Sequence, residues 1–288
     1  MNIDKPATWT SRDVVNRVQR FVRPAKAGHA GTLDPLATGV LVVCIGPATR
    51  LIEYVQQQHK RYRGTFLLGR ESDTEDVEGE VRELDAPPIP SLAEIEAQLP
   101  RFVGTIEQRP PAYSALKVQG RRAYDLARSG QEVKLAPRPI EIFELAIVRY
   151  EYPELVLDIH CGSGTYVRSL GRDLAESLGT AAVMSALVRT AIGVFHLENS
   201  VALETLNADT IAGHLLSPRL AITGMPTVDL NTEDVVRLRQ GKTIDNPVAI
   251  AGGELAAFDP QGELVAIVQP VEPNLLQPTR VFPSSITS

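Results

Sequence analysis

The 288-residue sequence contains only two cysteines, Cys44 and Cys161, and both lie in apolar stretches. This scarcity is typical of a reduced, cytoplasmic protein, and we expect that location. The five histidines are scattered, and no Cys/His cluster has metal-ligand spacing, so we expect no metal. No apolar run approaches the roughly 20 residues that span a bilayer, and the N-terminus lacks the apolar stretch of a signal peptide, so we expect no membrane partner.

The chain also lacks an overall basic charge, since its formal net charge is −6. The charges are unevenly distributed, however. Residues 5–26 hold six Lys or Arg against one acid, and residues 109–138 hold seven against two. Residues 71–96, in contrast, hold ten acids against one arginine. Such tracts are usually solvated helix faces, but they also permit a local phosphate-binding surface on an otherwise acidic protein.

The most informative stretch is residues 28–41, which read Gly-His-Ala-Gly-Thr-Leu-Asp-Pro-Leu-Ala-Thr-Gly-Val-Leu. Its glycines permit turns, and Pro35 biases Asp34 away from helical geometry. The apolar run over 40–45 predicts a buried strand directly after this loop. From shape alone, a catalytic carboxylate at Asp34 and a simple turn-capping Asp are about equally consistent with the pattern.

Further motifs decide between these readings. They are Asp4-Lys5-Pro6, Lys60-Arg61-Tyr62, Arg109-Pro-Pro-Ala-Tyr-Ser-Ala-Leu-Lys117, Gly164-Thr165-Tyr166-Val167-Arg168 and Arg239-Gln-Gly-Lys242. Together with the stretch around Asp34, this ordered set resembles the TruB family of RNA pseudouridine synthases, over nearly the whole chain. Local departures from the family pattern are small: Ala30 and Thr32 stand at variable positions, and only four residues precede Lys5.

The resemblance implies an α/β (α+β) catalytic domain with a central, mainly antiparallel sheet, and a small C-terminal β-barrel of the PUA type. We expect the boundary near residue 222, giving domains 1–222 and 223–288, with a basic RNA-clamping insert at about 88–138. Local patterns predict capped helices over 9–22 and 91–99, and a helix over 167–178 that Gly179 ends. They also predict a hairpin of 139–150 with 154–161 and a short helix over 120–130. The C-terminal region contains eight acids and four bases, so any RNA contact there must use a restricted patch.

The resemblance also implies roles for individual residues. Asp34 is expected to be the catalytic carboxylate, with Arg168 as the partner that keeps it ionised in a dry pocket. Tyr62 is expected to stack on the flipped base or to act in proton transfer, although without the resemblance a core tyrosine is the better reading. Tyr166 has the same two readings, and Leu187 is expected to line the uracil pocket, where a leucine is equally typical of a core.

Three further sets of residues are expected to contact or support the RNA. His29 is expected to position the extruded loop, and Lys5 to support the active-site loop and substrate binding, although it reads as an exposed N-terminal lysine. The basic tract supplies backbone contacts, for which the candidates are Arg109, Lys117, Arg121 and Arg122.

The implied activity is the isomerisation of uridine 55 in the T-arm of tRNA to pseudouridine. The reaction breaks the C1′–N1 bond, rotates the base and joins C5 to C1′, so it needs a carboxylate beside the sugar but no cofactor. The sequence does not choose between a nucleophilic and an elimination route. We expect a monomer that requires no guide RNA.

Three alternatives remain at this point. An RNA-binding protein or tRNA-folding chaperone would retain the scaffold without catalysis, and the intact set of Asp34, Tyr62 and Arg168 argues against that as the sole role. A guide-RNA-dependent synthase subunit would depend on added guide RNA. A glycosidase would release free uracil.

Overall fold

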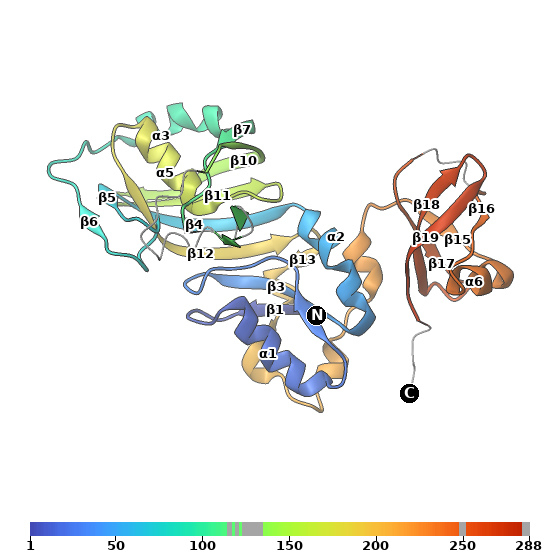
Figure 1. The fold of residues 1–288 in the computed structure, drawn as a ribbon. Helices are drawn as coiled ribbons and strands as arrows, with labels where there is room; N and C mark the ends of the chain where they lie inside the picture. Colours follow the sequence, from blue (N-terminus) through green and yellow to red (C-terminus); the bar gives the residue numbers. More distant parts are fainter. Residues whose placement is uncertain (114–116, 119–120, 123–134, 248–251, 284–288) are drawn as a thin grey trace.

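The computed structural model describes residues 1–113, 117–118, 121–122, 135–247 and 252–283. Figure 1 shows a large N-terminal part built on one sheet, and a smaller C-terminal part joined to it by an extended connection. The large part contains a ten-stranded sheet in the order β14-β1-β3-β12-β4-β11-β10-β7, with β13 beside β12 and β2 beside β3. Its strands are β1 (Asn2–Lys5), β2 (Ala27–His29), β3 (Thr38–Ile45), β4 (Lys60–Leu68), β7 (Gly104–Gln108), β10 (Arg138–Glu151), β11 (Glu154–Cys161), β12 (Ala182–Ile192), β13 (Phe195–His196) and β14 (Val201–Ala202).

This sheet is mainly antiparallel, as predicted. The exceptions are the pairs β1·β14 and β3·β12, which are parallel. The predicted hairpin is β10 with β11, and β11 continues the sheet through its antiparallel pairing with β4. The parallel pair of β3 with β12 brings the loop before residue 38 next to residues 188–189, which are 150 positions away in the chain.

Local capping signals explain where the first helices begin. Helix α1 (Ser11–Val22) starts after Thr10, whose side chain and that of Asp13 form a reciprocal capping box. Its buried valines pack with β1 and β3. Helix α3 (Leu92–Gln98) has the same device in Ser91 and Glu94. Both helices therefore confirm the sequence prediction, with ends within two residues of it.

Helix α5 (Val167–Ser177) covers the middle of the sheet. It packs on β12 and β4, and its buried face joins the largest core cluster with residues such as Phe66 and Leu157. Gly171 allows this close approach, because a Cβ there would lie 2.2 Å from the ring of Phe66. The first residues of α5 therefore lie directly over the strands that carry Tyr62 and Leu187.

The remaining elements of the large part are short. They are η1 (Gly46–Leu51), α2 (Ile52–Gln57), β5 (Arg70–Glu71), β6 (Arg82–Glu83), η2 (Leu99–Phe102), β8 (Lys117–Val118), β9 (Arg121–Arg122), η3 (Leu197–Asn199), η4 (Leu203–Thr205), η5 (Ile211–His214) and η6 (Pro218–Ile222). The helix predicted over 120–130 is wrong at its start, because Arg121–Arg122 pairs as a strand with Lys117–Val118; residues 123–130 lie outside the described residues. After β14 the chain forms only single 3₁₀ turns, η4 and η5, before η6 leads into the C-terminal part.

The C-terminal part is a curled five-stranded sheet in the order β15-β17-β18-β19-β16. Its elements are β15 (Thr227–Asp229), α6 (Thr232–Arg239), β16 (Ile244–Asp245), β17 (Leu255–Phe258), β18 (Leu264–Glu272) and β19 (Leu275–Val281). Residues 248–251, between β16 and β17, lie outside the described residues. One apolar cluster spans both parts of the chain, with Val42 and Val55 on one side and Phe258 and Phe282 on the other.

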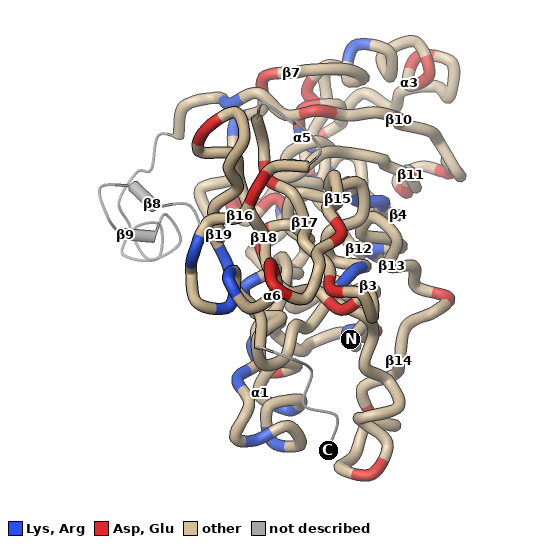
Figure 2. The backbone as a smooth tube through the Cα atoms, turned by 90° about the vertical axis from the view of Figure 1, so that its right-hand side faces the viewer, with Lys and Arg blue, Asp and Glu red and all other residues tan. Residues whose placement is uncertain are grey.

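Charged residues are distributed as the sequence suggests. Figure 2 shows several Lys and Arg positions along α1, and a mixture of acidic and basic positions on the C-terminal part. Among the helices of the described residues, none is long and apolar enough to cross a membrane.

Candidate active site

The loop that carries Asp34 is held by backbone-directed hydrogen bonds along its whole length. Ser11 both donates to the carbonyl of Leu33, at 3.2 Å, and accepts from its N–H, at 2.9 Å. The Pro35 carbonyl accepts from the N–H of Thr8 and from Lys5 Nζ, at 2.8 and 3.2 Å. The loop is therefore rigid on the protein side, and the carboxylate of Asp34 faces the other side.

Arg189 holds the first half of the same loop from inside the protein. It is one of the largest fully buried side chains, and its guanidinium donates to the carbonyls of Gly31, Thr32 and Val40 at 3.2, 3.4 and 2.7 Å. Gly39 makes this possible, because a Cβ on it would lie 2.3 Å from the carbonyl oxygen of Arg189. Arg189 was not predicted as a functional residue; its only local signal is an arginine within a mostly apolar strand.

Asp34 opens into a cavity of about 520 Å³ between the loop, the start of β4, the middle of β12 and the start of α5. Four other residues assigned from the sequence line this cavity, and they come from β4, β12 and the start of α5. The five residues brought together are Asp34, Tyr62, Tyr166, Arg168 and Leu187.

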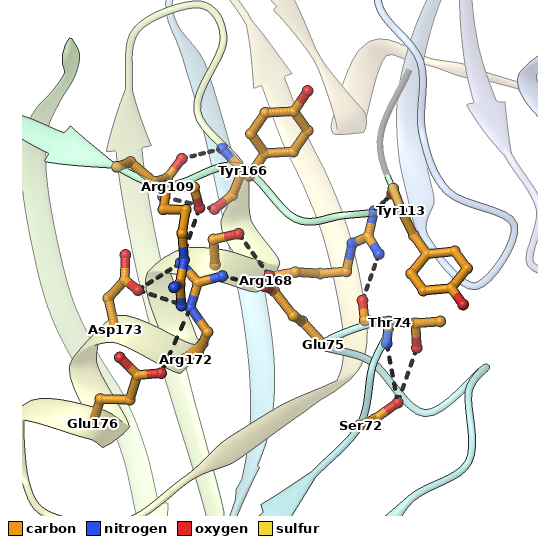
Figure 3. Close-up of polar contacts among 12 residues, drawn as sticks. Ser72, Thr74, Glu75, Arg109, Tyr113, Tyr166, Arg168, Arg172, Asp173 and Glu176 are labelled. Atoms are coloured by element: carbon orange, nitrogen blue, oxygen red, sulfur yellow. Dashed lines mark hydrogen bonds and ion pairs between the residues drawn. The ribbon is translucent and has the colours of Figure 1, made fainter. Parts of the chain in front are cut away.

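Arg168 pairs with two carboxylates in the cavity wall. Its Nε atom lies 3.2 Å from Asp34 Oδ2, as the resemblance implied. Its other nitrogens donate to Asp76 Oδ2, at 3.1 Å, and to the carbonyls of Thr74 and Tyr113, at 2.6 and 3.1 Å. Figure 3 shows Arg168 reaching between Thr74 and Tyr113. Because every side of the guanidinium has a partner, Arg168 has a single preferred position.

Asp76 is the second carboxylate of this network, and sequence reasoning missed it. Its side chain is 3% exposed, whereas that of Asp34 is 36% exposed. Asp76 also accepts from the hydroxyl of Thr74, at 2.6 Å, and from the N–H of Glu78, at 3.0 Å. It comes from the acidic tract 71–96, where nothing in the local pattern separates a buried acid from its exposed neighbours.

Tyr62 and Leu187 form the apolar floor of the cavity. Burial raises the pKa of the Tyr62 phenol, so at neutral pH the group is a neutral hydroxyl. Leu187 is 6% exposed and lies in both the main core and the cavity lining. This arrangement places two largely apolar side chains beside Asp34 in the cavity.

Tyr166 closes the cavity at the start of α5. The buried side chain of Gln108 fixes its backbone, since it accepts from Tyr166 N–H at 2.9 Å and donates to the Tyr166 carbonyl at 3.0 Å. The guanidinium of Arg138 lies 4.9 Å from the centre of the Tyr166 ring. Arg138 also donates to the carbonyl of Gly164, so the turn before α5 is held on both sides.

A second network anchors the 72–76 loop and residue 109 to α5. Arg172 pairs with Glu75 and donates to the carbonyl of Arg109, and Glu75 accepts from Ser169 Oγ at 2.6 Å. Arg172 and Glu75 are only 12% and 11% exposed. Figure 3 shows this group beside the Arg168 network, so α5 connects the cavity wall to the base of the basic tract.

Lys5 and His29 lie near the loop but outside the cavity lining. Lys5 is fully buried, which corrects the reading of an exposed lysine, and its ammonium donates to the carbonyls of Pro6, Trp9 and Pro35. Burial lowers the pKa of Lys5 to about 8. His29 is half-buried in β2, its Nδ1 atom has no hydrogen-bond partner among the described residues, and burial lowers its pKa. Lys5 therefore supports the loop, and neither residue lines the space beside Asp34.

Of the four residues expected to contact the RNA backbone, the structure describes the side chain of Arg109 alone. The carbonyl of Arg109 accepts from Arg172, and its side chain is exposed. For Lys117, Arg121 and Arg122 the structure describes only the backbone, in which Lys117 pairs with Arg122. Within the described ranges, no group of three or more His, Cys, Asp or Glu is placed to hold a metal ion.

Several known proteins are similar to this chain. Residues 19–167 match the family described as "TruB family pseudouridylate synthase (N terminal domain)", and residues 225–283 match "tRNA Pseudouridine synthase II, C terminal". The tRNA pseudouridine synthase B of Acaryochloris marina is 38% identical over 289 residues, which cover 99% of this chain and 98% of that protein. The protein of the same name from Dehalococcoides mccartyi is 40% identical over 291 residues, covering 98% and 95%.

Solved structures agree in fold. A Cbf5-Nop10-Gar1 complex contains a chain that is 26% identical, with a TM-score of 0.72, over 93% of this chain and 77% of that one. The archaeal box H/ACA sRNP Nop10-Cbf5 complex contains one with a TM-score of 0.74 at 22% identity, over 98% and 85%, a likeness of fold alone. With the family match over more than half of its residues and curated relatives along its full length, the chain belongs to the TruB family of pseudouridylate synthases.

Proposed function

We propose that this protein isomerises uridine to pseudouridine in tRNA, and that its target is uridine 55 in the T-arm. The observation that carries the proposal is the carboxylate of Asp34, which faces the cavity and pairs with Arg168 beside Tyr62 and Leu187. The curated relatives are named for this activity on tRNA.

The reaction conserves every atom of the uridine except one exchanged hydrogen. The C1′–N1 bond breaks, the uracil turns within the site, and C5 bonds to C1′ and loses its proton, while N1 gains one. Asp34 acts at the sugar, either by bonding to C1′ or by assisting removal of a sugar proton. Arg168 lies 3.2 Å from the carboxylate of Asp34, so its guanidinium balances the negative charge and holds the carboxylate in position.

The cavity walls would retain the free uracil after the C1′–N1 bond breaks and until the C5–C1′ bond forms. Leu187 and the ring of Tyr62 offer flat apolar contacts to the base, and Tyr166 covers it from α5. The neutral Tyr62 hydroxyl can donate a hydrogen bond or relay the C5 proton. Retention of the base is what separates this isomerase from a glycosidase, which would admit water and release uracil.

The RNA would be held outside the cavity by shape and by phosphate contacts. The target uridine must leave its stack to reach Asp34, and we assign to His29, in β2 beside the Asp34 loop, the role of supporting the opened RNA. We propose residues 1–222 as the catalytic domain, carrying the RNA-clamping insert 88–138, and residues 223–288 as an accessory RNA-binding domain. The chain acts as a monomer and without guide RNA.

The decisive experiment uses tRNA transcript tritiated at uridine C5. Because C5 must lose its hydrogen when it bonds to C1′, tritium release reports the reaction directly. Wild-type protein is expected to release tritium without added guide RNA, and the Asp34→Asn variant is expected to release none while still binding tRNA. Release by both proteins would remove Asp34 from the mechanism. Release by neither, with binding retained, would favour the chaperone or the guide-dependent subunit.

A further inference from the structure

Three aromatic rings pack together outside the cavity that holds Asp34. The imidazole of His59 stacks on the ring of Phe143, with 4.3 Å between centroids and 27° between planes. His160 completes the cluster, with its centroid 4.9 Å from that of Phe143 and 5.6 Å from that of His59. His59 is exposed to solvent, and the other two rings are half-buried. We call these three residues the ring cluster.

A β-bulge in β10 brings Phe143 to the two histidines. Opposite His160 and Cys161 of β11, strand β10 carries Ile142, Phe143 and Glu144, so Phe143 is the extra residue of a β-bulge. A bulge turns a side chain out of the regular alternation of a strand, and here it allows Phe143 to meet both histidines. The carbonyl of His59 accepts from the N–H of Gly193 at 2.9 Å, which fixes the turn between α2 and β4.

The ring cluster separates two hollows on the protein surface. One, of about 480 Å³, is lined by His59 and His160 together with Gln57 and Arg61. The other, of about 330 Å³, is lined by His59 and Phe143 together with Gln57 and Ser163. A flat ring entering either hollow would meet a face or edge of the cluster.

Both hollows adjoin the cavity that contains Asp34. Gln57 lines all three spaces, and Ser163 lines the cavity and the smaller hollow. An RNA strand whose target nucleotide occupies the cavity would therefore pass the ring cluster within the reach of its neighbouring nucleotides.

The chemistry of the cluster suits a nucleobase better than a phosphate. Glu141 lines the smaller hollow, and Glu144 pairs with Arg61 at 3.3 Å beside His160, so the local charge is not strongly positive. Burial, assisted by Arg61 and His59, lowers the pKa of His160 and keeps its imidazole neutral at physiological pH. Neutral aromatic rings bind unpaired bases by stacking, with little preference for sequence.

We propose that the ring cluster is a stacking site for an unpaired nucleobase of the substrate RNA, a nucleotide near the target uridine. The proposal rests on the proposed function, because it takes tRNA as the substrate. His59 is its outermost member and contacts the base, whereas Phe143 and His160 support the ring of His59.

The test is a double-mutant cycle between the protein and the RNA. T-arm stem–loop RNAs carry a single abasic nucleotide at each loop position in turn, the target excepted, and dissociation constants are measured in the Asp34→Asn background, where no conversion occurs. We expect His59→Ala to raise the dissociation constant for intact RNA by about 5- to 20-fold. For one loop position, the abasic RNA should bind the protein that retains His59 about as weakly as the intact RNA binds His59→Ala. Combining the abasic RNA with His59→Ala should raise the dissociation constant no further.

Two matched variants separate stacking from structural effects. His59→Phe keeps a ring but no imidazole nitrogen and is expected to restore binding and its sensitivity to the abasic site. His214→Ala removes a histidine from η5, outside the ring cluster, and is expected to bind like the parent. In protein that retains Asp34, the His59→Ala variant should have the wild-type kcat for tritium release at saturating tRNA and a raised KM for tRNA.

Other results would overturn the proposal. Unchanged binding by His59→Ala would remove His59 from the RNA contact. An equal loss for intact RNA and for every abasic RNA would indicate a phosphate contact or a structural effect instead of stacking. These outcomes differ from a failure of the proposed function, in which wild-type protein would release no tritium whatever the cycle shows.

Discussion

Arg168 and Asp76 form a buried ion pair, with 3.1 Å between Nη1 and Oδ2 and side chains that are 8% and 3% exposed. The cavity-facing Asp34 contacts the same guanidinium through Nε, at 3.2 Å. The arginine that pairs with Asp34 is therefore held in position by an acid that does not line the cavity. Asp34 faces the cavity, whereas Asp76 holds Arg168, the partner of Asp34, from the buried side.

Replacing Asp76 should consequently impair turnover without abolishing RNA binding. Asp76→Asn keeps the shape and removes the charge, so Arg168 loses its most buried partner and can leave Asp34. We expect kcat for tritium release to fall about tenfold or more, equivalent to about 1.4 kcal/mol or more in the barrier. Asp158→Asn, in an exposed pair with Arg63, is the matched control and should keep its kcat. A folded Asp76→Asn protein with wild-type kcat would contradict the positioning role.

Gly39 should tolerate no side chain. Its φ is +96°, and a Cβ would lie 2.3 Å from the backbone carbonyl oxygen of Arg189, which cannot rotate away. We expect Gly39→Ala to lower the free energy of unfolding by about 2–5 kcal/mol, from left-handed strain and overpacking together. Gly104 has nearly the same φ, +95°, and nothing within 4 Å of its would-be Cβ, so Gly104→Ala should cost only about 1–2 kcal/mol. Chemical denaturation measures both, and equal losses would contradict the steric argument.

Lys5 should make stability depend on pH in the alkaline range. Burial lowers its pKa in the folded state to about 8 from an ordinary value of 10.5. Between these two pH values the unfolded chain binds more protons at this site than the folded chain does, so the Lys5 contribution to stability rises with pH. Lys5→Met removes this contribution, and its free energy of unfolding should rise less, or fall more, from pH 8 to pH 10 than that of the wild type. Parallel pH profiles would contradict the lowered pKa.

The pair of Glu75 and Arg172 should be energetically coupled, unlike the exposed ion pairs of the sheet. Their side chains are 11% and 12% exposed, whereas Arg63 and Asp158 are each about half exposed. A double-mutant cycle of Glu75→Gln with Arg172→Met is expected to give a coupling above about 1 kcal/mol. The same cycle at Arg63 and Asp158 should give about 1 kcal/mol or less. Because Arg172 also holds the carbonyl of Arg109, Arg172→Met should raise KM for tRNA more than it lowers kcat.

Local structure was predictable to a large extent, because its causes lie within a few residues. The capping boxes at Thr10 and Ser91 mark the starts of α1 and α3, and Gly179, with a φ of +74°, ends α5 as expected. The hairpin of β10 and β11 follows from two strand-like runs separated by a short turn. The main failure is the helix expected over 120–130, where β9 pairs with β8 at its start. Helical periodicity does not reveal a cross-strand partner.

The sequence by itself determined the family, the loop around Asp34 and the residues that meet it in one cavity, since those motifs are contiguous and their order is distinctive. Only the tertiary structure decided that Asp76 is the buried partner of Arg168, that Lys5 lies inside the protein, and that His59 stacks on Phe143. Each of these depends on strand register and packing between segments that lie far apart in the chain. An acid, a lysine or a histidine has the same local pattern whether it faces solvent or the interior, and the sheet that chooses between them forms only when the whole chain folds.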